Sequence, residues 1–202
     1  MSLRAVRNFF LAVILAAVLA ATVVISRSPD AVYTAQELVN LSRFRRYDSL
    51  IVRIGTKQNV DPMLIKAVIW RESTFHPNKV GRNGERGLMQ ITEAAASDWA
   101  RNTKNDTFVP TDLFLPEVNI ECGTWYLKQA LSRYAGKDDP MTFALAEYNA
   151  GKRRVDKWLV DTNMGPHSTS GDLRDAISIP STREYVERIL ARYRFYKERG
   201  RM

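Results

Sequence analysis

The chain has 202 residues, of which 45% are hydrophobic and 26% are charged, a balance that suits one compact domain with an attached segment and excludes two full domains. Its net charge of +8 implies anionic surroundings, such as nucleic acid, a phospholipid surface or an acidic cell-wall polymer. The single cysteine, Cys122, excludes an internal disulfide and a multi-cysteine zinc site. The two histidines, His76 and His167, lie far apart, so we expect neither a metal site nor a cofactor.

An uncharged apolar segment lies near the N-terminus. It runs from Phe9 to Ile25, with Arg4 and Arg7 before it and Arg27 just after it. Its seventeen residues fall between the core of a signal peptide, about 7–15 residues, and a membrane-spanning helix, about 17–25 residues. The preceding arginines favour an orientation with the N-terminus on the cytoplasmic side of the membrane. We expect residues 1–28 to be an uncleaved membrane anchor, with a cleaved signal segment as the alternative, and in both cases the rest of the chain is exported.

Helical signals dominate the exported part. No segment alternates with the period of two that strands show, so we predict an all-α domain behind the N-terminal hydrophobic helix. Residues 29–44 are expected to form a linker and the start of a first helix, and the domain proper covers residues 45–200. The capping-box spacing of Thr34-Ala35-Gln36-Glu37 predicts that this helix begins there and reaches about Lys57.

Two later helices each start with an aspartate followed by a proline. Asp61-Pro62 and Asp139-Pro140 each place an N-cap residue before a proline at the first helical position. The first pair predicts a helix that ends near Glu72, and the second predicts a helix through Tyr148. Between them, Pro116 to Tyr134 carries apolar residues at helical spacing and predicts a further helix.

The other segments are more polar. Gly81 to Gly87, with the sequence GRNGERG, predicts a loop, and Leu88 to Arg101 predicts a helix. Residues 161–178 are expected to form a long polar loop. A second capping box, Ser181-Thr182-Arg183-Glu184, predicts the start of a basic helix that reaches about Arg199.

One apolar helix ends on a glutamate. Ile65, Val68, Ile69 and Glu72 follow one another at spacings of three and four, so they share one helix face. The apolar members of that face pack inward, and we therefore expect the carboxyl group of Glu72 at the core-facing end of the helix, lining an opening. A half-buried carboxyl group with few balancing charges has a raised pKa, which suits a general acid. The alternative is a surface glutamate paired with an arginine such as Arg71.

Three short motifs follow Glu72-Ser73 in order along the chain. They are Gly87-Leu88-Met89-Gln90, Tyr148-Asn149-Ala150-Gly151 and Thr182-Arg183-Glu184-Tyr185-Val186. One such motif is weak evidence, but the ordered series with helices between its members resembles the catalytic domain of the SLT-type lytic transglycosylases. These bacterial enzymes cut peptidoglycan strands with a lysozyme-like, goose-type helical domain. The resemblance covers about residues 45–198 and implies that fold here.

The resemblance also implies roles for individual residues. Glu72 matches the family's single catalytic acid, and Ser73 matches the serine that lines the cleft beside it. Gln90 matches the residue that contacts sugar near the scissile bond. Tyr148 matches the tyrosine whose hydroxyl group hydrogen-bonds the catalytic glutamate, and Asn149 matches an asparagine that contacts substrate.

A further match is less specific, and the chain departs from the family pattern at two places. Tyr185 matches an aromatic residue of the cleft wall, although its helical position suits the core equally well. Ser181 replaces the usual glutamate of the last motif, and the loop from Gly81 to Gly87 is more charged than usual. Glu147 precedes Tyr148, but adjacent helical residues point about 100° apart, so we interpret Glu147 as structural or subsite-forming.

The resemblance implies a reaction with one carboxyl group. Glycosidases with two carboxyl groups place them about 5–9 Å apart across the scissile bond, and no motif here supplies a second one. Glu72 would protonate the β-1,4 bond between N-acetylmuramic acid and N-acetylglucosamine, and then act as the base that closes a 1,6-anhydro ring.

Two alternatives remain, namely a lysozyme-type muramidase that hydrolyses the same bond and a non-catalytic, membrane-tethered glycan-binding module. The expected partners are peptidoglycan strands and the membrane, because nucleic-acid binding fits poorly with export. The expected location is the inner membrane facing the periplasm, or the cell wall if the N-terminal segment is cleaved.

Overall fold

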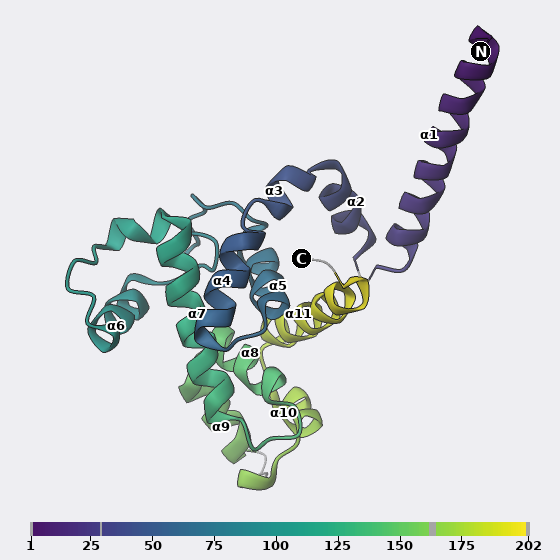
Figure 1. Ribbon diagram of the computed structural model, residues 1–202. Helices are drawn as coiled ribbons and strands as arrows, with labels where there is room; N and C mark the ends of the chain where they lie inside the picture. The colour runs from purple at the N-terminus through teal and green to yellow at the C-terminus, as the bar shows by residue number, and fades with distance from the viewer. Residues whose placement is uncertain (1, 29, 162–164, 201–202) are drawn as a thin grey trace. The chain divides into compact units, whose positions relative to one another are not determined.

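The computed structural model describes residues 2–28, 30–161 and 165–200 (Figure 1). Within these ranges the regular structure is helical and no strand forms, which confirms the predicted all-α fold class. The chain divides into two compact units, one ending at Arg45 and one beginning at Arg46. The site lies in the second unit.

The described residues of the first unit form three helices, α1 Leu3–Ser26, α2 Ala31–Val39 and α3 Leu41–Arg45. With 24 residues and a mean hydropathy of 2.8, α1 is the one helix of the described ranges that is long and apolar enough to cross a membrane. At a rise of about 1.5 Å per residue, a helix of this length also exceeds the roughly 30 Å hydrocarbon core. A signal segment would satisfy the same criteria.

The prediction of one helix from Thr34 to Lys57 is wrong. Asp30 is the N-cap of α2, because its side chain accepts a hydrogen bond from Tyr33 N at 3.0 Å, and Thr34 lies inside that helix. The helical run is broken at Asn40 and again between Arg45 and Asp48, where α4 begins. The capping-box spacing at Thr34 therefore placed the start of this helix too late, because the residue that caps it is Asp30.

The second unit contains the remaining helices. Their bounds are α4 Asp48–Gln58, α5 Pro62–Ser73, α6 Glu93–Thr103, η1 Pro110–Phe114, α7 Pro116–Arg133, α8 Pro140–Ala150, α9 Lys152–Asp161, η2 Gly165–His167, α10 Ser170–Ala176 and α11 Pro180–Arg199. The expected helix starts at Asp61 and Asp139 are confirmed, since their side chains accept hydrogen bonds from Met63 N at 2.8 Å and Met141 N at 3.2 Å.

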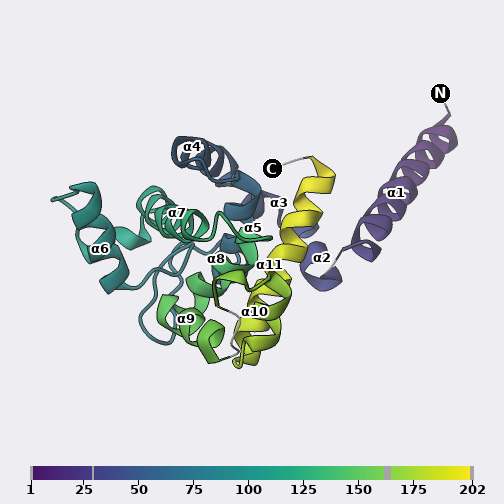
Figure 2. The ribbon, with the colours of Figure 1, turned by 90° about the horizontal axis from the view of Figure 1, so that it is seen from below.

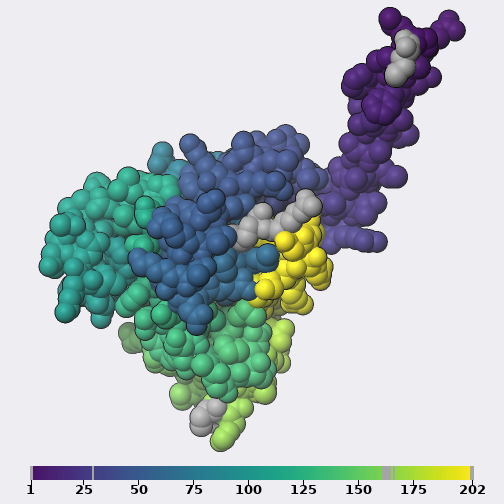
Figure 3. Space-filling model, viewed as in Figure 1, coloured from purple at the N-terminus to yellow at the C-terminus, as the bar shows by residue number. Residues whose placement is uncertain are grey.

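The core of this unit lies around α5 and α8. Helix α5 packs against α4 and α11, and α8 packs against α7 and α11. Figure 2 shows α6 at one end of the unit and α11 toward the other, with α7 and α8 between them. In the space-filling view, the teal segment around α6 and the green segments of α8 to α10 occupy different parts of the unit's surface (Figure 3).

Helix α5 is buried almost all round. Leu64, Ile65, Val68 and Ile69 are each no more than 2% exposed, so the helix that carries Glu72 cannot shift without disturbing the core. This burial fixes the position of Glu72 at its end.

Two further predictions are corrected. The predicted helix Leu88–Arg101 begins only at Glu93, because Gln90 has φ 50° and Thr92 caps α6 by accepting from Ala95 N at 3.2 Å. The predicted loop 161–178 contains α10, which the reciprocal capping box of Thr169 and Asp172 starts. Residues 162–164 of that loop lie outside the described residues.

The last helix also begins earlier than predicted. Helix α11 starts at Pro180 with Ile179 as its N-cap residue, so Ser181 is already helical. Its end at Arg199 agrees with the prediction.

Candidate functional site

The end of α5 is an abrupt turn. After Ser73, Thr74 and Phe75 both adopt left-handed backbone conformations, with φ of 55° and 60°. Such a conformation is unfavourable for residues other than glycine, by about 1 kcal/mol or more each. The side chain of Phe75 is 1% exposed, and this burial helps to offset the strain. The turn ends the helix directly after Glu72-Ser73 and leaves Glu72 at the edge of the core.

Glu72 is half-buried and held by two polar contacts. The hydroxyl group of Tyr185 donates to Glu72 Oε1 at 2.7 Å, and the ammonium group of Lys79 donates to the backbone carbonyl oxygen of Glu72. Burial raises the pKa of Glu72 to about 7, while the bond from Tyr185 and the charges of Lys79 and Arg71 act in the opposite direction. Near neutral pH the side chain therefore populates both the acid and the carboxylate, as a group that gives and then takes a proton must do.

The hydroxyl group that contacts Glu72 belongs to Tyr185, not to the predicted Tyr148. Tyr148 instead donates to the carbonyl oxygen of Met89 at 3.0 Å. It is still close enough that, after burial, the charge of Glu72 contributes to holding the pKa of Tyr148 well above its usual value. Sequence spacing gives the helix face on which a tyrosine lies, but the direction of its long side chain depends on which acceptor is nearer.

Glu72 faces a cleft of about 550 Å³. Its walls come from the end of α5, the loop before Gly87, the turn at Gln90, the end of α8 and the start of α11. The lining residues are Arg71, Glu72, Lys79, Val80, Gly81, Arg82, Asn83, Glu85, Gln90, Thr92, Tyr148, Asn149, Ser181 and Tyr185. The structure thus brings together Glu72, Gln90, Tyr148, Asn149 and Tyr185 as the sequence predicted.

Ser73 has a different place from the one predicted. The residue is 1% exposed, and it is not among the described residues that line the cleft. Its hydroxyl group donates to the carbonyl oxygen of Ile69 at 3.2 Å. Adjacent helical residues point about 100° apart, so if Glu72 faces the cleft Ser73 turns toward the core.

The turn that carries Gln90 is built on Gly87 and Asn119. A Cβ atom on Gly87, which has φ 79°, would lie 2.2 Å from Asn119 Nδ2 and 2.3 Å from the carbonyl oxygen of Leu113. Asn119 is fully buried and accepts from Met89 N at 2.7 Å while donating to the carbonyl oxygens of Arg86 and Leu113, both at 2.8 Å. Sequence reasoning missed Asn119, whose only signal is a polar residue on the apolar face of a predicted helix.

Gln90 and Asn149 each use part of their amide group within the protein. The Gln90 nitrogen donates to the carbonyl oxygens of Lys79 at 3.1 Å and Gly87 at 3.0 Å. Asn149 is exposed, and its amide oxygen accepts from the Thr182 hydroxyl group at 2.8 Å. The Gln90 oxygen and the Asn149 nitrogen are the amide atoms that remain for a ligand.

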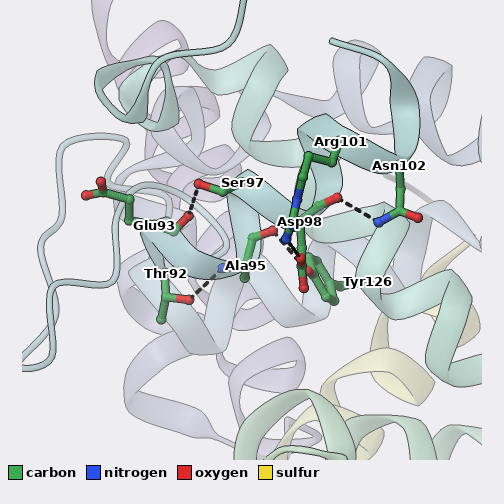
Figure 4. Close-up of polar contacts among 8 residues, drawn as sticks. All are labelled: Thr92, Glu93, Ala95, Ser97, Asp98, Arg101, Asn102 and Tyr126. Carbon is green, nitrogen blue, oxygen red and sulfur yellow. Dashed lines mark hydrogen bonds and ion pairs between the residues drawn. The ribbon is translucent and has the colours of Figure 1, made fainter. Parts of the chain in front are cut away.

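A second hollow of about 310 Å³ adjoins the cleft, since Gln90, Thr92 and Tyr148 line both. Tyr126 forms part of it and donates to the carbonyl oxygen of Ala95 at 2.9 Å, in the first turn of α6 (Figure 4). The hollow around Glu72 therefore continues toward α6 and α7.

Glu147 lies on this second hollow. Its carboxylate forms an ion pair with Arg133 and accepts from the hydroxyl group of Tyr134 at 2.8 Å. It therefore points toward α7, away from the side of α8 on which Tyr148 faces the cleft.

A family model described as the transglycosylase SLT domain matches residues 49–168. The chain belongs to this family. The match runs from α4 to η2 and includes Glu72, Gln90, Tyr148 and Asn149.

Curated relatives of this SLT domain share about three tenths of their aligned residues with it. It is 31% identical over 180 residues to the membrane-bound lytic murein transglycosylase F of Desulfosudis oleivorans, covering 78% of this chain and 38% of the relative. It is 30% identical over 152 residues to the soluble lytic murein transglycosylase of Salmonella typhimurium, covering 75% of this chain and 23% of the relative. The chain thus spans well under half the length of these relatives.

Solved structures show the same fold. The lytic transglycosylase Slt of Pseudomonas aeruginosa, solved as an inactive mutant with glutamine in place of a glutamate, gives a TM-score of 0.68 at 27% identity, covering 77% of this chain and 25% of that one. The 70 kDa soluble lytic transglycosylase of Escherichia coli in complex with bulgecin A gives 0.67 at 26% identity, covering 85% and 26%. The helical, lysozyme-like architecture expected for the SLT domain is confirmed.

Proposed function

We propose that the protein is a peptidoglycan lytic transglycosylase whose catalytic residue is Glu72. The observation that carries this proposal is the position of Glu72: half-buried at the wall of a 550 Å³ cleft, bonded to Tyr185, with a pKa of about 7. Membership of the SLT family and the names of the relatives, lytic murein transglycosylases, support the substrate class. That an Slt structure was solved as an inactive glutamate-to-glutamine mutant agrees with an essential glutamate.

The proposed reaction uses Glu72 twice. Protonated Glu72 gives its proton to the oxygen of the β-1,4 bond between N-acetylmuramic acid and N-acetylglucosamine, and that bond breaks as the second sugar leaves with the proton. The acetamido group of the muramic acid stabilises the positive charge at C1. The Glu72 carboxylate then takes the proton of the C6 hydroxyl group, whose oxygen bonds to C1 and closes the 1,6-anhydro ring. Proton transfer of this kind contributes about 10²–10⁴-fold.

Neighbouring residues position Glu72 and the sugars of the substrate. Tyr185 fixes one oxygen of Glu72 by a 2.7 Å bond, which leaves the other oxygen to exchange the proton. The pKa of Tyr185 is well above its usual value because of burial and the charge of Glu72, so its hydroxyl group stays a donor. Gln90 and Asn149 each offer one amide atom to the sugars.

One observation favours the hydrolytic alternative. Glu85 lies in the same cleft, and hydrogen bonds from Asn83 lower its pKa, so Glu85 is a carboxylate at neutral pH. A second carboxylate in the cleft is what a muramidase would need to activate a water molecule.

Mass spectrometry of digested sacculi separates the two reactions. We expect products that end in 1,6-anhydro sugars, loss of all turnover in Glu72→Gln, and unchanged product chemistry in Glu85→Gln. Reducing-end products that disappear in Glu85→Gln would instead identify a hydrolase. Strand binding without any turnover by the wild-type protein would identify a glycan-binding module.

We further propose that the SLT domain acts on the periplasmic side of the inner membrane, held there by α1. The apolar α1 and a relative named as membrane-bound support this location, and the arginines at positions 4 and 7 favour an N-terminus on the inside.

A further inference from the structure

The cleft around Glu72 holds three cationic side chains. Arg71, Lys79 and Arg82 all line it, together with the carboxylate of Glu85. When Glu72 is protonated, these four side chains leave the cleft wall with a net charge of +2, that is three positive charges and one negative. The loop from Gly81 to Gly87 contributes part of this charge, and the sequence already marked it as more charged than is usual before the motif at Gly87.

None of the three cations has a carboxylate within ion-pair distance among the described residues. Arg71 stacks over the ring of Tyr185, with its guanidinium carbon 5.7 Å from the ring centre, and its Nε atom is buried without a hydrogen-bond partner. Arg82 is exposed, and Lys79 contacts the backbone carbonyl oxygen of Glu72. Other cations of this unit, such as Arg53 and Lys57, do have acidic partners.

The first step of the proposed reaction, in which Glu72 acts as an acid, does not need these charges. Positive charges near Glu72 favour its carboxylate form, and so they oppose the protonated state with which the reaction begins. The hydroxyl and acetamido groups of the sugar rings are neutral, so they do not call for cations either. An anionic group of the ligand is the remaining partner that would be stabilised by them.

The anionic groups of a peptidoglycan strand are attached to its muramic acid residues. The lactyl group of each muramic acid ends either in a free carboxylate or in a peptide stem with carboxylates of its own. We propose, building on the function proposed above, that Arg71, Lys79 and Arg82 bind a carboxylate carried on the lactyl side of the strand. The SLT domain then selects strands that are anionic at the muramic acid next to the cleavage site. The planar guanidinium group of Arg71 suits two parallel bonds to one carboxylate.

Four strand preparations test this selection and identify the source of the carboxylate. The first is a peptide-free strand with lactyl carboxylates, and the second is the same strand after amidation with methylamine. The third and fourth are a peptide-bearing strand and its amidated form. We expect at least one acidic strand to have a kcat/KM about tenfold above that of its amidated form at low salt, falling toward equality at 0.5 M NaCl. A preference within the first pair identifies the lactyl carboxylate, and one within the second pair identifies the peptide stem.

Matched variants assign the preference to the cleft. Arg82→Gln removes an exposed charge and should reduce the ratio of acidic to amidated kcat/KM about fivefold, while Arg82→Lys should retain most of the ratio. Arg53→Gln on α4 makes the same change of net charge away from the cleft and should leave the ratio unchanged. An equal reduction of this ratio in Arg82→Gln and Arg53→Gln would overturn the proposal, since the preference would then come from the overall electrostatic field of the protein.

Binding separates this inference from the reaction. The Glu72→Gln variant should bind an acidic strand about tenfold more tightly than its amidated form, whatever the products of the wild-type protein are. Equal affinities for acidic and amidated strands in both pairs would overturn the inference and leave the proposed reaction intact. Absence of turnover with this preference still present would overturn only the reaction.

Discussion

At the scale of single residues, opposing influences set the proton affinity of Glu72. Burial raises the pKa of Glu72, and three neighbours, Tyr185, Lys79 and Arg71, reduce the rise and leave it at about 7. With burial alone the side chain would stay protonated and be a poor base, and with full exposure it would ionise near its ordinary value and be a poor acid. The half-buried position at the end of α5 supplies the balance between these extremes.

Tyr185→Phe tests this balance. The hydroxyl group of Tyr185 stabilises the carboxylate of Glu72, so removing it should raise the pKa of Glu72 by about one unit. A general acid is lost as pH rises through its pKa. The falling limb of the pH profile of kcat/KM should therefore move to higher pH by about one unit, with a lower maximum because Glu72 is less well positioned.

Tyr148→Phe is the matched control for that experiment. Its hydroxyl group donates to the carbonyl oxygen of Met89 and not to Glu72, so its loss should move the falling limb less than Tyr185→Phe does. If Tyr148→Phe produced the larger shift, the assignment of Tyr185 as the positioning residue would be wrong.

At the scale of elements, the sequence predicted those parts of the site whose position depends on local periodicity. Glu72 shares a face with Ile65, Val68 and Ile69, and burial of that face is enough to place it at the core edge. Leu88 to Gln90 were predicted as helix, but they form a turn whose conformation depends on a hydrogen bond between Met89 and Asn119, 30 positions further along the chain. Such a partner leaves no periodic signal.

Asn119→Ala tests how far this turn depends on one side chain. The change removes three hydrogen bonds and leaves the amide group of Met89 and the carbonyl oxygens of Arg86 and Leu113 without that partner. We expect the free energy of unfolding to fall by about 3 kcal/mol and kcat/KM to fall with it, because Gln90 loses its position. Urea denaturation followed by tryptophan fluorescence measures the first effect.

The exposed Asn102 on α6 serves as its control, since it makes one hydrogen bond to the carbonyl oxygen of Asp98 at 2.8 Å (Figure 4). Asn102→Ala should change the free energy of unfolding by less than about 0.5 kcal/mol. Equal effects of the two substitutions would show that Asn119 does not hold the turn.

At the scale of the whole molecule, the N-terminal unit and the SLT domain call for separate tests. If α1 is an uncleaved anchor, the protein expressed in bacteria should sediment with the inner membrane, resist extraction by 1 M NaCl and keep its N-terminal residues in intact-mass measurement. A chain without residues 1–28 should not associate with membranes. A mass that corresponds to cleavage near the end of α1 would identify a signal segment instead.

The same carboxyl group that we propose for catalysis should also weaken the fold at high pH. The pKa of Glu72 is raised from 4.5 to about 7 in the folded protein, so folding favours its protonated form. The free energy of unfolding therefore falls as pH rises from about 4.5 to about 7, by about 3 kcal/mol for this group. Glu72→Gln has no charge to bury, and it should equal the wild type in stability near pH 4 and exceed it by about 3 kcal/mol at pH 8.

Glu147→Gln, which loses the ion pair with Arg133, is the control and should be no more stable than the wild type at pH 8. Denaturation of the full chain in detergent at both pH values measures these differences, and a gain for Glu72→Gln that is equal at pH 4 and pH 8 would mean that the carboxyl group is not held in a buried, proton-favouring site.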